Sequence, residues 1–180
     1  MPHKKFLDLS KVYYVEVDNI DGCSGTITVA TEHMKLWGID SEELDKIATI
    51  NTFKNNKITL MSLADMIGEI VLEEDVAMEE IDIPDIPMYA LTFKSRIYGA
   101  AAMVCEDIIK KFADFVEDDL YIIPSSIHEL LIIPCHSSQQ DVTHLKYMIR
   151  EVNSTQVAEE EILSYNLYFY SREKDEIEIV

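Results

Sequence analysis

The sequence predicts an α+β fold with a largely antiparallel sheet and helices packed on it, and its pattern suggests two similar halves. Strand-like runs of β-branched and aromatic residues come in pairs, and amphipathic segments with helical spacing separate the pairs. Hydrophobic residues make up 48% of the 180 residues, which excludes a wholly disordered chain. The two halves, residues 1–72 and 88–180, both open with a predicted hairpin and a helix.

The first half begins with the first of these hairpins. Residues 12–17 are β-branched and aromatic, and residues 26–29 alternate polar with apolar side chains, so both segments favour strands. Between them, residues 19–25 contain the Asn, Asp, Gly and Ser residues that are typical of turns.

Three helices are predicted to follow. Thr31 is predicted to cap the first, a short helical turn that ends at Gly38, a residue suited to the left-handed conformation of a helix end. Asp40 begins the second helix, which ends at residues 55–56, and Thr59 begins the third. Apolar residues at helical spacing support the second and third helices: Leu44, Ile47 and Ala48, then Leu63, Ile67, Ile70 and Val71.

An acidic segment, residues 73–87, separates the two halves. It holds seven acidic residues, no basic residue and two prolines. Like-charge repulsion and proline both oppose compact structure, so we expect a linker here.

The second half is predicted to contain a strand over residues 88–93 and a small-residue strand over 100–104. A helix follows over residues 106–118. One face of this helix is apolar and the opposite face is charged. The predicted apolar face consists of Ile108, Ile109, Phe112, Phe115 and Val116.

Two nearly continuous apolar runs, residues 120–124 and 129–134, predict central strands covered on both faces. The residues between them form a hairpin loop. A helix over residues 140–152 and a short one ending at Leu163 come next. Residues 167–170 and 177–180 then predict a closing hairpin.

The charge of the chain limits its partners. Fifteen basic and 34 acidic residues give a net charge of −19, which disfavours nucleic acid and membrane surfaces. The longest apolar stretch, residues 97–105, is far shorter than the roughly 20 residues of a membrane-spanning helix. Three cysteines without paired spacing suit a reducing compartment, so we expect a cytoplasmic protein.

The densest group of chemically active side chains is Ser125, Ser126, His128 and Glu129. A serine nucleophile needs a base within reach and a third group that orients the base. A tight loop rarely supplies that geometry, and the chain has no Gly-x-Ser-x-Gly motif. We therefore expect Ser125 and Ser126 to form a turn and His128 and Glu129 to begin the next strand, and we assign no catalytic residue.

The sequence predicts no metal site and no cofactor. Cys135, His136 and His144 could join His128 as zinc ligands, but their spacing matches no standard pattern. The five glycines form neither a phosphate loop nor a dinucleotide motif.

Several strings of this sequence are similar to those of a known family. They cover residues 36–39, 41–44, 88–92, 99–102, 119–129 and 150–157, and the two most specific are Pro-Ser-Ser-Ile-His-Glu and Val-Asn-Ser-Thr-Gln-Val. On these strings the chain resembles the DUF5688 family of anaerobic Gram-positive bacteria. The resemblance implies no particular chemistry. It adds Asn153 to the binding candidates Ser125, Ser126, His128 and Glu129, since loops often carry recognition.

This chain departs from the family in one respect. Family members have roughly a hundred more residues on the amino-terminal side, so we expect this chain to lack that part and any function it has.

Three functions remain open. The favoured one is a non-catalytic binding or adaptor module with a protein partner. The alternatives are an acidic mimic of nucleic acid that blocks a basic protein, and a small hydrolase centred on His128. The sequence does not predict an oligomeric state.

Overall fold

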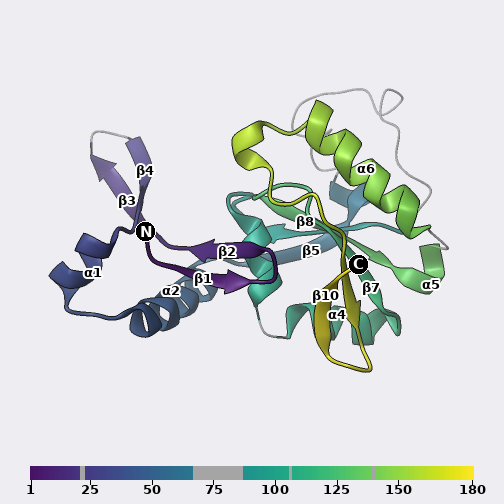
Figure 1. Ribbon diagram of the computed structural model, residues 1–180, viewed down its shortest axis with the longest axis horizontal. Coiled ribbons are helices and arrows are strands. Elements are labelled where there is room, and N and C mark those ends of the chain that lie inside the picture. Colours follow the sequence, from purple (N-terminus) through teal and green to yellow (C-terminus); the bar gives the residue numbers. More distant parts are fainter. Residues whose placement is uncertain (21–22, 67–86, 106, 139–140) are drawn as a thin grey trace. The chain divides into compact units, whose positions relative to one another are not determined.

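The computed structural model describes residues 1–20, 23–66, 87–105, 107–138 and 141–180 (Figure 1). The chain divides into two compact units, Met1–Asn55 and Asn56–Val180. These are referred to below as unit 1 and unit 2.

Unit 1 contains two antiparallel hairpins and two helices. The predicted hairpin is confirmed, although the predicted strand over residues 12–17 is divided between two strands. The turn predicted over residues 19–25 is wrong at both ends, because residues 19–20 and 23–25 belong to the strands of the hairpin; residues 21–22 lie outside the described residues. The elements are β1 (His3–Phe6), β2 (Leu9–Val12), β3 (Tyr14–Ile20), β4 (Cys23–Thr28), α1 (Thr31–Trp37) and α2 (Ser41–Asn55).

The predicted helix ends at Gly38 and Asp40 are confirmed, whereas the N-cap residue of α1 is Ala30 and not the predicted Thr31. Gly38 has a φ of 70° and ends α1 in the left-handed conformation. Oδ1 of Asp40 accepts hydrogen bonds from the backbone amides of Glu42 and Glu43, which fixes the start of α2. The core of this unit consists of Tyr13, Val29, Met34 and Leu44.

Unit 2 is built on a six-stranded antiparallel sheet in the order β10-β9-β7-β8-β6-β5. The fold class is therefore α+β, and the two apolar runs occupy the centre of the sheet as predicted. The strands are β5 (Ile58–Ser62), β6 (Tyr89–Phe93), β7 (Leu120–Ile123), β8 (Glu129–Pro134), β9 (Tyr168–Ser171) and β10 (Glu176–Ile179).

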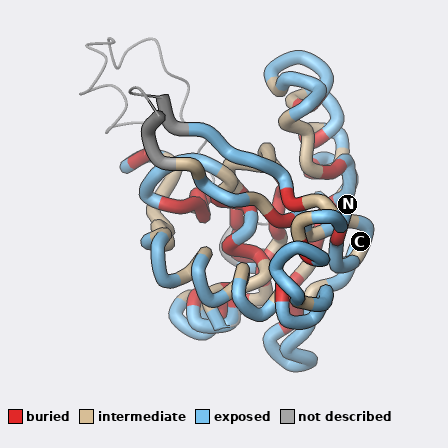
Figure 2. The backbone as a smooth tube through the Cα atoms, turned by 90° about the vertical axis from the view of Figure 1, so that its left-hand side faces the viewer, coloured by how far each residue is buried: buried red, intermediate tan, exposed pale blue. Residues whose placement is uncertain are grey.

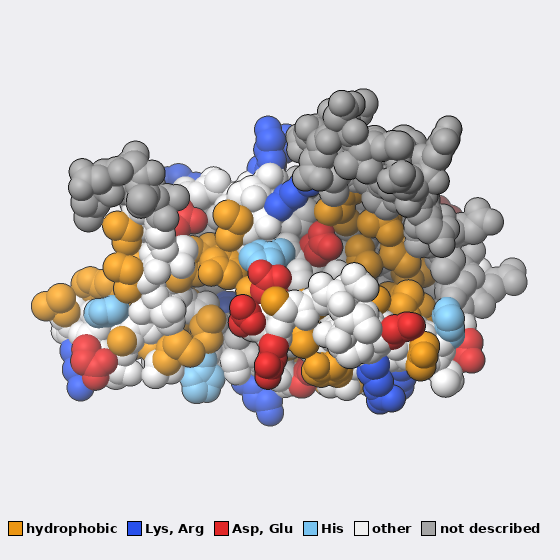
Figure 3. All heavy atoms as spheres, turned by 90° about the horizontal axis from the view of Figure 1, so that it is seen from above, with side chains coloured by type: hydrophobic (Ala, Val, Ile, Leu, Met, Phe, Trp, Pro, Cys, Tyr) orange, Lys and Arg blue, Asp and Glu red, His pale blue; other side chains and the backbone are white. Residues whose placement is uncertain are grey.

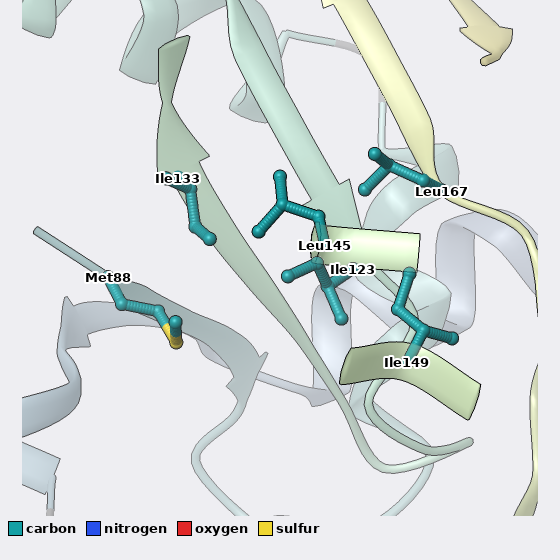
Figure 4. Packing of buried hydrophobic residues seen from close by; sticks show 6 residues of the cluster. All are labelled: Met88, Ile123, Ile133, Leu145, Ile149 and Leu167. Carbon is teal, nitrogen blue, oxygen red and sulfur yellow. The ribbon is translucent and has the colours of Figure 1, made fainter. Parts of the chain in front are cut away.

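Helices cover both faces of this sheet, with α6 (Val142–Thr155) on one side and α4 (Ile108–Val116) on the other (Figure 1). Leu145 and Ile149 of α6 pack against Ile123 and Ile133 (Figure 4). On the opposite face, Phe112 of α4 meets Tyr89 with ring centroids 4.8 Å apart. Burial on both faces explains why the central strands have nearly continuous apolar sequences. Figure 2 shows the buried positions in red.

Three short elements complete unit 2. They are the 3-10 helix η2 (Gly99–Val104), α5 (Cys135–Ser138) and the 3-10 helix η3 (Glu159–Glu161). None of the helices in the described ranges is long and apolar enough to cross a membrane.

The prediction that a helix starts at Thr59 is wrong, because that residue lies in β5 and pairs with Thr92 of β6. Residues 63–66 are helical, and the Ser62 hydroxyl accepts a hydrogen bond from the Asp65 amide. The helix therefore starts at Ser62. The residues before it, 58–61, are apolar enough to join the sheet as part of β5. Consequently the division between the units falls at residues 55–56, ahead of the acidic segment. Residues 73–86 of that segment lie outside the described residues.

The strand predicted over residues 100–104 is also wrong, because η2 occupies it. A Cβ atom on Gly99 would lie 2.2 Å from Oγ1 of Thr92 and 2.4 Å from the carbonyl oxygen of His128. The small side chains of this segment thus allow a helical turn to lie close to the sheet, which apolar periodicity alone does not reveal.

The described part of unit 1 has two separate hairpins, and that of unit 2 has one six-stranded sheet. One further expectation fails. Phe115, assigned to the apolar face of α4, has 82% of its surface exposed.

Candidate functional site

Four of the five predicted binding residues lie together, three in the turn between β7 and β8 and Glu129 at the start of β8. We name residues 125–129 the His128 loop. The Ser126 amide donates to the Glu129 carbonyl over 3.2 Å, and the His128 amide donates to the Ser126 hydroxyl over 3.0 Å. The Ser125 hydroxyl lies 3.4 Å from Oε1 of Glu129. Both serines therefore hold the turn in shape, as the sequence predicts.

Three other elements hold the His128 loop in place. The Thr92 hydroxyl of β6 donates to the His128 carbonyl over 2.7 Å. The Ala100 amide of η2 donates to the Ile127 carbonyl over 3.3 Å, and the Ile127 amide donates to the Glu161 carbonyl of η3 over 2.9 Å. These bonds join segments more than 25 residues apart in the sequence, so the His128 loop connects β6, η2 and η3.

The His128 side chain is engaged on its face and at both nitrogens. Its Nδ1 accepts a hydrogen bond from the Tyr98 amide over 3.1 Å, and the two rings stack with centroids 5.7 Å apart. Its Nε2 lies 3.5 Å from Oε1 of Glu161. Because Nδ1 is an acceptor, the neutral ring carries its proton on Nε2, facing that carboxylate. The side chain is 31% exposed, so one part of the ring reaches the surface.

This geometry does not pair either serine with the imidazole as a nucleophile with its base. The Ser126 hydroxyl accepts from the backbone, the Ser125 hydroxyl bonds to Glu129, and both ring nitrogens of His128 face other groups. A backbone amide at Nδ1 also occupies the place that an orienting carboxylate takes in a catalytic triad. The arrangement suits a fixed recognition surface better than acyl transfer.

Asn153, the fifth predicted binding residue, has a different setting. Its side chain is buried on α6 and donates to the Ser164 carbonyl over 2.9 Å. The Ser164 hydroxyl accepts in turn from the Asn166 amide over 3.0 Å. The structure thus places Asn153 where it supports the chain between α6 and β9.

The Cys135–His136 pair lies at the start of α5, beside the buried carboxylate of Asp118. Asp118 accepts a hydrogen bond from the His136 amide over 2.7 Å and contacts the imidazole at Nδ1. The bond to Asp118 raises the pKa of His136. Burial, reinforced by Asp118 and Asp119, raises the pKa of the Cys135 thiol to about 12, so the thiol stays protonated at neutral pH.

Within the described ranges, no three or more histidine, cysteine or acidic side chains are arranged to hold a metal ion.

Sequence reasoning missed Thr92, Tyr98, Gly99 and Glu161 as parts of this site. Gly99 offered the one available signal, a single glycine inside an apolar stretch, which often marks close approach of backbone segments. Thr92, Tyr98 and Glu161 lie about 30 residues from their loop partners, and no local pattern connects them.

Comparison with known proteins identifies a family without identifying an activity. No curated protein and no solved structure matches the chain. The family model described as "Family of unknown function (DUF5688)" matches residues 1–172. The matched residues include the His128 loop and the two most specific strings of the resemblance, Pro-Ser-Ser-Ile-His-Glu and Val-Asn-Ser-Thr-Gln-Val. The chain therefore belongs to the DUF5688 family.

Proposed function

We propose that this chain is a cytoplasmic, non-catalytic binding or adaptor module that recognises a protein partner through the His128 loop. The observation that carries the proposal is the engagement of the His128 ring by Tyr98 and Glu161, which leaves the imidazole partly exposed and fixed in orientation.

A recognition surface of this kind benefits from rigidity. Hydrogen bonds from β6 and η2, and one to η3, fix the backbone of the His128 loop before any partner arrives. A preformed loop loses little conformational entropy on binding, which favours affinity. The net charge of −19 makes a protein a better-suited partner than nucleic acid.

Photo-crosslinking tests this proposal. A benzophenone side chain replaces Ser125, and a control protein carries it in place of Glu173, an exposed residue between β9 and β10. In lysate of the source organism, we expect discrete adducts from position 125 that excess untagged protein suppresses. Identical adducts from both positions, or none from position 125, would remove the His128 loop as the recognition surface.

A further inference from the structure

Residues 94–98, the loop that follows β6, lie beside the His128 loop, and we name them the Ile97 loop. Residues 94–97 are exposed, and 55% of the Ile97 surface is accessible. Among the described residues of unit 2, Ile97 is one of the exposed large hydrophobic residues, together with Phe115, Tyr147, Tyr165 and Ile179. Figure 3 shows how hydrophobic and charged side chains mix on one face of the molecule.

The backbone on both sides of Ile97 is held in an uncommon conformation. Arg96 has a φ of 55° and Tyr98 a φ of 52°, a left-handed region that residues other than glycine seldom adopt. Hydrogen bonds fix both residues: the Arg96 amide donates to the Phe93 carbonyl, and the Tyr98 amide donates to His128. Strain held in this way is common where a loop presents a functional side chain. Here it keeps Ile97 turned toward solvent.

The charged residues of the Ile97 loop are basic, whereas unit 2 as a whole is acidic. Residues 56–180 contain 9 basic and 25 acidic residues, a net charge of −16. Three of these 9 basic residues, Lys57, Lys94 and Arg96, lie at this end of the sheet and are exposed. The Lys94 amide donates to the Lys57 carbonyl over 2.8 Å, which places the first two side by side.

We propose that Ile97 is the apolar anchor of the recognition surface, and that its partner is an acidic protein segment with an apolar side chain between its carboxylates. This inference rests on the proposed function and names the partner class of the same surface. An apolar side chain would cover Ile97, while carboxylates would meet Lys57, Lys94 and Arg96. A lysine-rich partner would meet like charges here, although the rest of unit 2 would attract it.

Fluorescence anisotropy with defined peptides tests the inference on the full chain. One probe is a short fluorescein-labelled glutamate peptide with one central leucine, and a second has alanine in place of the leucine. We expect the leucine peptide to bind about tenfold more tightly, as for burial of one leucine side chain. Ile97→Ser should abolish this preference, and the control Ile179→Ser, at another exposed isoleucine, should retain it. The double variant Lys94→Gln/Arg96→Gln should weaken both peptides alike.

Three results would overturn the inference: no saturable binding of the leucine peptide, an unchanged leucine preference in Ile97→Ser, or tighter binding of a lysine–leucine peptide that ignores Ile97. Melting curves confirm that the variants are folded. If the peptides fail while position 125 still gives specific crosslinks, the proposed function stands and only the partner class is lost.

Discussion

The Tyr98 amide donates a hydrogen bond to Nδ1 of His128 over 3.1 Å, and the two rings stack upon each other. Tyr98 keeps its left-handed φ of 52° at that point. The imidazole therefore serves as the acceptor that holds a strained backbone segment against the turn between β7 and β8. This relationship makes His128 a structural centre of the candidate site and gives a direct test of its role.

Replacing His128 separates the acceptor function from the rest of the ring. His128→Ala leaves the Tyr98 amide without its acceptor and should lower the free energy of unfolding by about 1–3 kcal/mol. His128→Asn keeps a short acceptor side chain and should lose less. Urea denaturation followed by circular dichroism measures both changes. His144→Ala, at an exposed position of α6, is the control and should change stability little. Equal losses in the Ala and Asn variants would contradict the acceptor role.

Gly99 should tolerate no larger residue. In Gly99→Ala the new Cβ would lie 2.2 Å from Oγ1 of Thr92 and 2.6 Å from the Phe93 amide nitrogen, so backbone must move. We expect a loss of about 1–3 kcal/mol or more in the free energy of unfolding. Gly25→Ala is the matched control, because no atom lies within 4 Å of its added Cβ. Similar melting temperatures for the two variants would show that η2 is not packed as described.

The elements that the sequence predicted correctly are those whose pattern is strong within one segment. The apolar runs of β7 and β8 and the helical spacing of Leu145 and Ile149 each specify an element without help from distant residues. β5 and η2 were mistaken because each is about five or six residues long and apolar, a pattern common to strands and helical turns. Their conformation depends on pairing with β6 and on close contact at Gly99.

The same distinction applies to the site. The His128 loop was found because four polar residues lie within five positions of the sequence, whereas Thr92, Tyr98 and Glu161 join it only through tertiary contacts. Phe115 shows that a helical pattern can also mislead, because its spacing fits the apolar face of α4 and yet its ring is exposed.

Asp45 should make unit 1 sensitive to acid. Burial alone would raise the pKa of this carboxyl group, but hydrogen bonds from Lys11, Lys4 and Tyr13 together lower it from 3.8 to about 2. A lowered pKa stabilises the folded state above the unfolded-state value, and this stabilisation is lost as the pH falls from about 4 through 2. Asp45→Asn should lose about 1–2 kcal/mol at neutral pH and show a flatter acid profile.

Trp37 is the only tryptophan of the chain and lies in unit 1, so its fluorescence follows this transition. Glu16→Gln, at an exposed position of β3, is the control and should keep the acid profile of the original chain. An unchanged profile in Asp45→Asn would argue against the role of this carboxylate.

His136 should titrate above its ordinary range. Its hydrogen bond to the buried Asp118 raises its pKa above 6.5. A raised pKa stabilises the folded state fully below pH 6.5, and this stabilisation disappears as the pH rises through the folded-state value. NMR titration of the imidazole proton should therefore give a midpoint above 6.5, which Asp118→Asn moves back toward 6.5. A midpoint that Asp118→Asn leaves in place would assign the shift to another group.

Leu145 and Phe115 should respond to truncation in opposite ways despite similar helical patterns. Leu145 is fully buried against the strands, so Leu145→Ala leaves a cavity and should cost about 2–5 kcal/mol in the free energy of unfolding. Phe115 is 82% exposed, so Phe115→Ala removes little packing and should change stability by less than about 0.5 kcal/mol. Chemical denaturation of both variants measures these changes in the free energy of unfolding. A loss of several kcal/mol in Phe115→Ala would mean that the ring is covered in solution.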